Sequence, residues 1–268
     1  MSLILISVLP VIILAFYIYN KDKEKEPTEL LIKLFFGGAG SVFIAAVIYL
    51  FLNKFFPIIL TDDYGVGFLS SCLRVFFSIG LVEEFSKWII LYHISYDHYE
   101  FDQVFDMIVY SAFVALGFAC IENIFYVYEH GAGVGFARAF SAVPAHFFFG
   151  IFMGYYLSMA KLSSVKGDYS LELKYKVFSI LVPALLHSIY DSCLFMDPIF
   201  YVSVFDKYVG LNFIIFLGFV IVLYIVSFSR IKYSLRYSGK LRYKNKFCPN
   251  CGTPVKSDCC PGCGCRNE

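Results

Sequence analysis

Seven long apolar segments dominate this sequence, and each is long enough to cross a lipid bilayer. A spanning helix needs about 20 mostly apolar residues, and the lipid interior offers no partner to an unpaired backbone group. The segments also lack the alternation of polar and apolar residues that is typical of strands. We therefore expect an all-α polytopic membrane protein with about seven transmembrane helices, over residues 2–20, 30–52, 66–92, 104–128, 134–160, 175–196 and 208–229.

The composition agrees with a membrane protein and argues against the soluble classes. Hydrophobic residues make up 59% and charged residues 16% of the 268 residues, whereas soluble domains average about 45–50% and about 25%. The net charge is only +1, so we expect the lipid bilayer and not a nucleic acid as the partner of this chain. The first apolar segment has neither a basic start nor a small-residue cleavage site, so we interpret it as a retained helix.

Lysine and arginine lie mostly on one side of the predicted helices. Fifteen of them flank the connections after the first, fifth and last helices: Lys21, Lys23, Lys25, Lys33, Lys161, Lys166, Lys174, Lys176 and the seven between Arg230 and Lys246. Only Lys54, Arg138 and Lys207 flank the other side. Cytoplasmic connections carry the excess of basic residues. We therefore expect a multi-pass protein of the cell membrane with its N-terminus outside and its C-terminal tail in the cytoplasm.

A second module is expected at the C-terminus, where six of the nine cysteines fall in the last 21 residues. Residues 248–264 read CPNCGTPVKSDCCPGCG and contain two CxxC pairs. Four thiolates in such pairs are typical of a closed, structural zinc site, and metal binding supplies the folding energy of so small a module. The sequence predicts a Zn²⁺ ribbon held by Cys248, Cys251, Cys260 and Cys263, with Cys259 and Cys265 left over.

Three parts of the chain follow from these patterns. They are a transmembrane domain over residues 1–230, a basic linker over 231–247 and the ribbon over 248–268. A closed four-cysteine site is structural, so we expect the ribbon to contact a soluble partner or the cytoplasmic face of the protein itself.

The most informative residues are ionisable groups well inside the apolar segments. Placing one charge at the centre of a spanning helix costs about 2.5–3.5 kcal/mol, so such groups usually face a bundle interior or a wet cavity. Four of the predicted helices carry them: Glu83, Glu84, Lys87, Glu122, His146, His187 and Asp191. We expect these side chains to face one another or water.

Their spacing places several of these groups on shared helix faces. Glu83 and Glu84 precede Lys87 by four and three residues, so its ammonium can pair with either carboxylate. One carboxylate can then stay ionised while burial drives the other toward its neutral form. His187 and Asp191 are also four residues apart, so the carboxylate can fix the imidazole tautomer.

Four motifs in this order resemble one known family. They are EEFSK at 83–87, FACIEN at 118–123, His146 with Gly150 and Gly154, and HSIYD at 187–191. The series is similar to that of the PrsW-type intramembrane proteases, which are related to the type II CAAX prenyl endopeptidases and bacteriocin-processing membrane proteases. The resemblance covers about residues 66–196. The CAAX enzymes carry an arginine and a histidine where this chain has Lys87 and Glu122, so no prenylated substrate is inferred.

The resemblance implies an intramembrane endopeptidase that hydrolyses peptide bonds of membrane proteins, such as single-pass regulators. It implies that Glu83 and Glu84 include the general base, and that Glu122 holds the attacking water or a metal. His146 and His187 would orient the water or stabilise the oxyanion. Asp191 would support His187, with Lys87 and Asn123 as further supporting residues.

Whether an active-site metal takes part stays open at the level of sequence. A Zn²⁺ site is one possibility, with Glu122, His146, His187 and one of the paired glutamates, Glu83 or Glu84, as its ligands. Activation of water by glutamate and histidine alone is the other. Two further functions are weighed against the protease: an ion- or proton-coupled transporter, because buried Glu, His and Lys residues also serve as relays, and a non-catalytic membrane scaffold.

Four smaller expectations concern these motifs and their surroundings. Straight, upright helices would place Glu83 and Glu122 at depths about 13 Å apart, so their meeting in one site has to be tested. Asp102, Asp106 and Tyr110 share a helix face and are expected to form a wet entrance. Arg138 should snorkel outward or pair with an acidic neighbour. Gly150 and Gly154 should let another helix approach closely.

Overall fold

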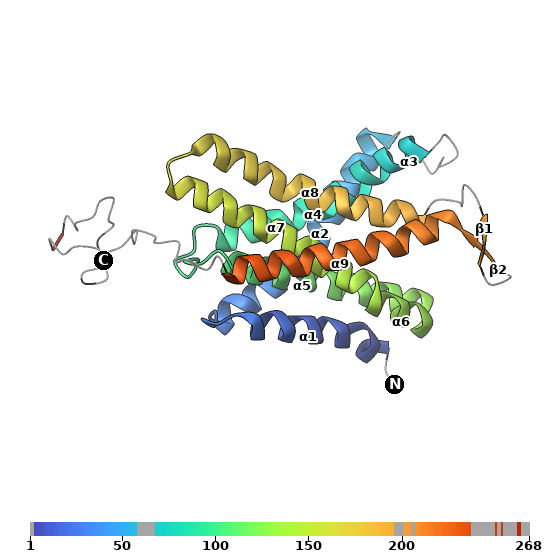
Figure 1. Ribbon diagram of the computed structural model, residues 1–268, viewed down its shortest axis with the longest axis horizontal. Coiled ribbons are helices and arrows are strands. Elements are labelled where there is room, and N and C mark those ends of the chain that lie inside the picture. The colour runs from blue at the N-terminus through green and yellow to red at the C-terminus, as the bar shows by residue number, and fades with distance from the viewer. Residues whose placement is uncertain are drawn as a thin grey trace.

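The chain folds into a bundle of helices with one short hairpin, as a computed structural model shows (Figure 1). The structure describes residues 3–57, 68–195, 201–204 and 207–236, and residues 250, 253, 262 and 263 of the tail. The helices are α1 (Leu3–Lys21), α2 (Thr28–Phe55), α3 (Phe68–Val75), the π-helix η3 (Phe76–Gly80), α4 (Leu81–Ser95), α5 (Asp106–His130), α6 (Ala132–Phe140), α7 (Ala142–Val165), α8 (Tyr169–Phe195) and α9 (Leu211–Arg236). The strands are β1 (Tyr201–Val204) and β2 (Lys207–Gly210).

Within the described ranges, six helical segments are long and apolar enough to cross a membrane: Leu3–Lys21, Thr28–Phe55, Asp106–His130, Ala132–Val165, Tyr169–Leu194 and Leu211–Arg236. Six of the seven predicted spans overlap them, so the expected multi-pass helical architecture is confirmed. The predicted span 66–92 is not among the six, because the helix there is divided into α3, η3 and α4. A π-helical turn inside an α-helix is rare and often marks a functional site.

The hairpin is the one departure from an all-helical fold that the described residues show. Its two strands are antiparallel, with Tyr201 opposite Gly210 and Val204 opposite Lys207. Aromatic and β-branched residues, which favour strands, make up most of both segments. The sequence predicts a loop before residue 208 and a helix from residue 208 onward. The prediction for residues 201–204 and 207–210 is therefore wrong, because both segments are strands.

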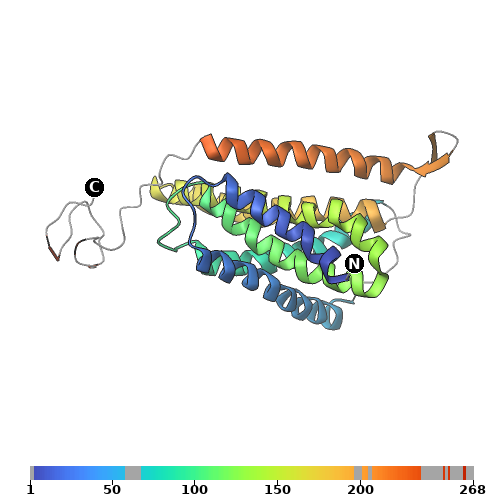
Figure 2. The same cartoon turned by 90° about the horizontal axis from the view of Figure 1, so that it is seen from below.

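Helix α5 forms the centre of the bundle. It packs against α1, α2, α6 and α7, and most of its residues are buried. Helix α8 packs on α7, while α9 lies outside against α7 and α8. Figure 2 shows α2 and α9 along opposite edges of the bundle. The lipid-facing helices α1, α2 and α9 thus surround a buried core made by α5 and α7.

Glycines bring α2 and α7 into close contact with α5. A Cβ atom added at Gly38 of α2 would lie 2.8 Å from the Cα atom of Val114 and would also meet its carbonyl oxygen. A Cβ atom at Gly150 of α7 would lie 2.9 Å from the carbonyl oxygen of Ser111, and one at Gly154 would meet the Ser111 hydroxyl. The predicted close approach at Gly150 and Gly154 is therefore confirmed.

A buried cluster joins the α1–α2 connection to the start of α5. The Tyr110 hydroxyl donates a hydrogen bond to Glu26 Oε2. Asp106 Oδ2 accepts hydrogen bonds from the backbone N–H groups of Asp102 at 3.0 Å and Gln103 at 2.7 Å. Because Glu26, Asp106 and Tyr110 are all buried, the expected wet entrance is wrong. Asp106 instead orders the turn that precedes α5.

The packing of α2 on α5 predicts a contrast between two glycines of the same helix. Gly38→Ala should lower the free energy of unfolding by about 1–3 kcal/mol, because the added methyl group overpacks the contact with Val114. Gly40→Ala should cause no loss, since a Cβ atom there meets nothing within 4 Å. Thermal unfolding of the purified variants in detergent measures both effects, and equal melting temperatures would contradict the close contact.

The buried cluster predicts a pH dependence of stability. Burial raises the pKa of Glu26 to about 7, although the hydrogen bond from Tyr110 opposes part of that rise. The folded state therefore binds more protons than the unfolded state between about pH 4.5 and pH 7, and the free energy of unfolding falls as pH increases across this range. The fall attributable to Glu26 is on the order of 3 kcal/mol.

Glu26→Gln should remove this contribution while keeping a side chain of similar shape. The variant should lose less stability than the unmodified protein when the pH rises from 5 to 8, measured as the shift in melting temperature. Parallel pH profiles of the two proteins would show that Glu26 is not protonated in the folded state.

Candidate active site

A cavity of about 760 Å³ lies within the bundle. Its walls come from α2, η3, α4, α5, α6, α7 and α8, and most of them are apolar. The charged and imidazole groups on these walls are Glu83, Glu122, Arg138, His146, His187 and Asp191. Five of these six residues belong to the predicted catalytic set, so the structure brings those five together.

The expected difference in depth between Glu83 and Glu122 does not keep them apart. Helix α4 continues to Ser95, beyond the predicted end at residue 92, and α5 begins at Asp106, later than predicted. Glu83 thus lies 12 residues from the end of α4, and Glu122 lies 16 residues from the start of α5. The four-residue difference amounts to about 6 Å along straight helices, and both side chains reach the same cavity.

The adjacent carboxylates of Glu83 and Glu84 have different surroundings. Lys87 Nζ lies 2.7 Å from Glu84 Oε1 and 3.8 Å from Glu83 Oε2. Glu84 is fully buried, whereas the Glu83 side chain is 18% exposed and lines the cavity. Glu83 Oε2 is itself shielded and has no hydrogen-bond partner. One carboxylate is therefore paired with the lysine and the other faces the cavity.

Both ring nitrogens of His146 are engaged. Its Nδ1 atom lies 2.9 Å from Lys87 Nζ, and an ammonium group can only donate, so Nδ1 accepts. The ring proton then resides on Nε2, which donates to Glu122 Oε2 at 2.7 Å. These two contacts fix the ring orientation and the tautomer of His146.

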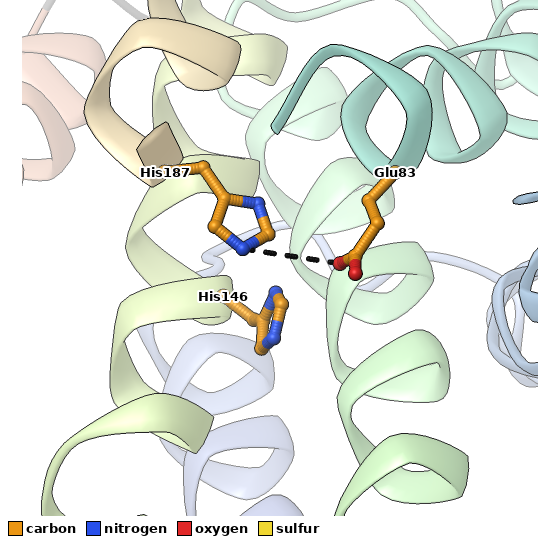
Figure 3. A group of neighbouring side chains, drawn as sticks. All are labelled: Glu83, His146 and His187. Atoms are coloured by element: carbon orange, nitrogen blue, oxygen red, sulfur yellow. Dashed lines mark ion pairs between the residues drawn. The ribbon is translucent and has the colours of Figure 1, made fainter. Parts of the chain in front are cut away.

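His187 presents one nitrogen to the cavity. Its Nδ1–H group donates to Glu84 Oε1 at 2.9 Å, because a carboxylate oxygen only accepts. Its Nε2 atom lies 3.3 Å from Asp191 Oδ2 and 3.9 Å from Glu83 Oε2, and Figure 3 shows this nitrogen pointing toward Glu83. Asp191 contacts the ring as its spacing predicts, but the shorter contact is made by Glu84.

Arg138 links two further helices to the site. Its Nη2 atom lies 3.0 Å from Glu122 Oε2, and its Nε–H group donates to Asn123 Oδ1 at 3.1 Å. The guanidinium lies 3.9 Å from the centroid of the Tyr126 ring. Asn123 in turn donates through Nδ2 to the backbone carbonyl of Ser7 at 2.9 Å. Of the two expectations for Arg138, pairing with an acidic neighbour is confirmed, and α1 and α6 are both attached to the site.

Two phenylalanines complete the walls: Phe118, the first residue of the FACIEN motif, and Phe149, and the sequence motifs assign a role to neither side chain. The Lys87 ammonium lies 4.1 Å from the centroid of the Phe118 ring, a favourable cation–π arrangement. Phe149 stacks on the His187 ring with centroids 5.0 Å apart. Each phenylalanine lies about one helical turn from a motif residue, a spacing from which they could have been found.

The donor groups fit a metal ion. Glu83, His146 and His187 each offer one ligand atom, and these atoms all lie within 4.8 Å of one another (Figure 3). One carboxylate and two imidazoles form a common catalytic zinc set, and the unpartnered Glu83 Oε2 is available as a donor. Of the carboxylates considered as ligands, Glu83 lies with the two histidines in this set, whereas Glu122 does not, and its Oε2 atom contacts His146 and Arg138.

Most of the predicted zinc ribbon lies outside the described residues. This applies to Cys248, Cys251 and Cys260 and to the leftover Cys259 and Cys265. The fourth predicted ligand, Cys263, is exposed, and its Sγ atom accepts a contact from Asn250 Nδ2 at 3.8 Å.

Comparison with known proteins identifies the family. Residues 26–226 match the family described as "PrsW family intramembrane metalloprotease". "Protease PrsW" of Geobacillus kaustophilus is 38% identical over 191 residues, which cover 71% of this chain and 78% of that protein. The Bacillus subtilis protein is 38% identical over 71% of this chain and 81% of its own length. The Clostridioides difficile protein is 31% identical over 91% and 96%.

No solved structure matches this chain. The family match covers three quarters of the sequence and includes all seven elements that line the cavity. This family match supports the protease and not the transporter or the non-catalytic scaffold. This chain therefore belongs to the PrsW family and is a multi-pass intramembrane protease of the metallo type.

Proposed function

We propose that this protease hydrolyses peptide bonds of membrane-protein substrates, such as single-pass regulators, with Glu83 as the general base. One observation carries the assignment: a carboxylate oxygen without a hydrogen-bond partner lies beside two histidines on the wall of a cavity inside the bundle. A general base must reach the water that it deprotonates. Glu83 meets this requirement, while Glu84 is occupied by Lys87 and His187.

The active-site metal of the proposal is Zn²⁺, which His146, His187 and one carboxylate oxygen of Glu83 would hold, so that the other Glu83 oxygen stays available to take the proton of the water. When bound, zinc supplies a Lewis acid that polarises the substrate carbonyl and acidifies a water molecule. His187 can offer Nε2 once that nitrogen gives up its proton and its contact with Asp191 Oδ2, while its Nδ1–H group continues to donate to Glu84. His146 can join only by giving up its contact with Lys87 or with Glu122.

The remaining predicted site residues act by orienting these groups. Hydrogen bonds that ligating histidines donate to outer carboxylates fix the tautomer and basicity of the rings, and Glu84 accepts such a bond from His187. Asp191 lies beside the same ring. Glu122 holds His146 and is itself held by Arg138, which Asn123 positions. Lys87 balances the negative charge of the two adjacent glutamates.

Cleavage inside a helix requires local unwinding of the substrate. The backbone of a spanning helix is protected by its own hydrogen bonds, and a carbonyl within such a bond is not open to attack. Helix-breaking residues near the cleaved bond should therefore assist hydrolysis.

A seven-crossing topology completes the proposal, with the N-terminus outside and the tail in the cytoplasm. The seventh crossing is made by α3, η3 and α4 together. Two observations support it. The end of α9 lies in Figure 1 at the same end of the bundle as the α1–α2 and α7–α8 connections, opposite the β1–β2 hairpin. The basic residues that mark cytoplasmic connections are concentrated at that end.

The tail is proposed to form a zinc ribbon held by Cys248, Cys251, Cys260 and Cys263, which recruits a soluble partner. The contact between Asn250 and Cys263 supports it, because these residues belong to the two different CxxC pairs. A Cβ atom added at Gly262 would also lie 3.2 Å from Thr253 Cβ. The described residues on either side of the tail, Asn250 and Thr253 on one and Gly262 and Cys263 on the other, therefore lie close together.

Replacing the proposed base should abolish cleavage without unfolding the protein. Glu83→Gln and His187→Ala should each lower kcat at least about 100-fold on a fluorogenic reporter that carries one membrane-spanning helix. Glu129→Gln is the matched control, since this carboxylate is 75% exposed at the end of α5, and its kcat should stay within twofold. Turnover by folded Glu83→Gln would reject the role of Glu83.

Metal content separates the two proposed zinc sites. The unmodified protein should bind two zinc ions per chain, measured by elemental mass spectrometry. His146→Ala should retain only the tail ion, and the double variant Cys248→Ser/Cys251→Ser should retain only the active-site ion and keep its activity. Phenanthroline should inactivate the protein until zinc is restored. Two zinc ions per chain in His146→Ala would show that His146 does not hold the active-site metal.

A further inference from the structure

Helix α2 separates from the bundle halfway along its length. Its buried residues are Leu30, Leu31, Leu34, Gly38, Ser41 and Ala45. Beyond Ala45 none of its side chains is buried, and the exposed fractions reach 66% at Val47 and 64% at Leu50. Figure 2 shows this helix along one edge of the molecule. The first half of α2 is thus packed closely on α5, whereas the second half keeps only partly buried contacts, through Ile48 and Leu52.

The helix that faces this free half is held by another neighbour. Segments α3 and η3 make their main contacts outside α4 with α8. At Gly80 the backbone approaches α8 so closely that an added Cβ atom would meet Ala184 O at 2.6 Å. Because α2 packs on α5 and η3 packs on α8, α2 and η3 diverge from a common point. That point is the small cluster of Ala45, Val82 and Phe118.

The catalytic cavity occupies the wedge between them. On one side it is lined by Val42, Ala46, Tyr49 and Leu50 of α2, and on the other by Ser78 and Ile79 of η3; we call this the side opening. Glu83 directly follows Val82, which belongs to the small cluster of Ala45, Val82 and Phe118. The side opening therefore leads from the lipid-facing surface of α2 directly to the proposed base.

Two other lateral routes are covered within the described residues. Helix α1 lies against α5 and α6, and α9 lies against α7 and α8. Neither α1 nor α9 contributes a residue to the cavity wall that the described residues form. A spanning helix that approached from either of these sides would first have to displace a whole helix of the bundle.

The lining of the side opening indicates its occupant. It is aliphatic or aromatic apart from Ser78 and the Tyr49 hydroxyl, so it suits a segment that comes from lipid. The cavity volume of about 760 Å³ lies in the range of pockets that hold drug-sized molecules. It accommodates a short unwound stretch of peptide but not a complete helix of about 10 Å diameter.

We propose that the membrane-spanning helix of a substrate docks in the side opening, between the outer half of α2 and η3, and that only its unwound stretch passes inward to Glu83. This inference rests on the proposed catalytic role of Glu83. It specifies the route and the surface that a membrane-embedded substrate uses.

Adjacent residues of α2 provide a matched test. Ala46 is exposed and lines the side opening, whereas Val47 is also exposed and does not line it. In liposomes, Ala46→Trp should lower kcat/KM for the single-helix fluorogenic reporter at least tenfold, and Val47→Trp should leave it within twofold. Equal rates for the two variants would overturn the side opening as the route.

Cross-linking tests docking without depending on cleavage. A photoreactive benzoylphenylalanine is placed at Tyr49 or at Val47 in the Glu83→Gln protein, together with the same reporter helix. Position 49 should cross-link the reporter at least five times more efficiently than position 47. Equal cross-linking, lipid adducts alone or a dimer of this chain at position 49 would each reject the proposal.

The two experiments separate the inference from the function on which it rests. Selective cross-linking at position 49 without any cleavage by the unmodified protein would support the docking surface and count against the catalytic assignment. Cleavage that is insensitive to Ala46→Trp would support the catalytic assignment and count against the side opening.

Discussion

Charged groups in a lipid environment must be neutralised by one another, and the active site is organised around this requirement. Glu84 Oε1 accepts hydrogen bonds from both Lys87 and His187, and Lys87 also contacts His146. One fully buried carboxylate thereby ties together residues of α4, α7 and α8. Without these contacts each charge would cost about 2.5–3.5 kcal/mol at the centre of a spanning helix. The same contacts leave Glu83 free to face the cavity.

Much of this arrangement could be predicted from the sequence. Six spans follow from the length of the apolar segments, because lipid permits few alternatives to a helix. The convergence of Glu122, His146 and His187 follows from the cost of isolating them. The separate surroundings of Glu83 and Glu84 follow only in part, because spacing shows that Lys87 can reach both carboxylates but not which one it selects. That choice depends on the position of α8, which brings His187 to Glu84.

Other features of the structure cannot be predicted from local sequence pattern. The π-helical η3 sits inside an apolar run in which α and π turns look alike, so the predicted third span shows no division. Arg138 belongs to a short helix that the sequence merges with α7, and its contact with Glu122 depends on the break at Ser141. Asp106 and Tyr110 look like polar residues near an interface, yet they are buried by Glu26 from a distant connection. Tertiary contacts decide all three cases.

The wide spacing of the site along the chain has a consequence for biosynthesis. The backbone carbonyl of Ser7 in α1 holds Asn123, and His187 comes from α8. A ribosome-bound chain that has released only its first hundred residues contains Glu83 and Glu84 but neither His146 nor His187. If the proposed residues carry catalysis, such an intermediate is inert toward neighbouring proteins at the translocon, and competence arises only after α8 joins the helices inserted before it.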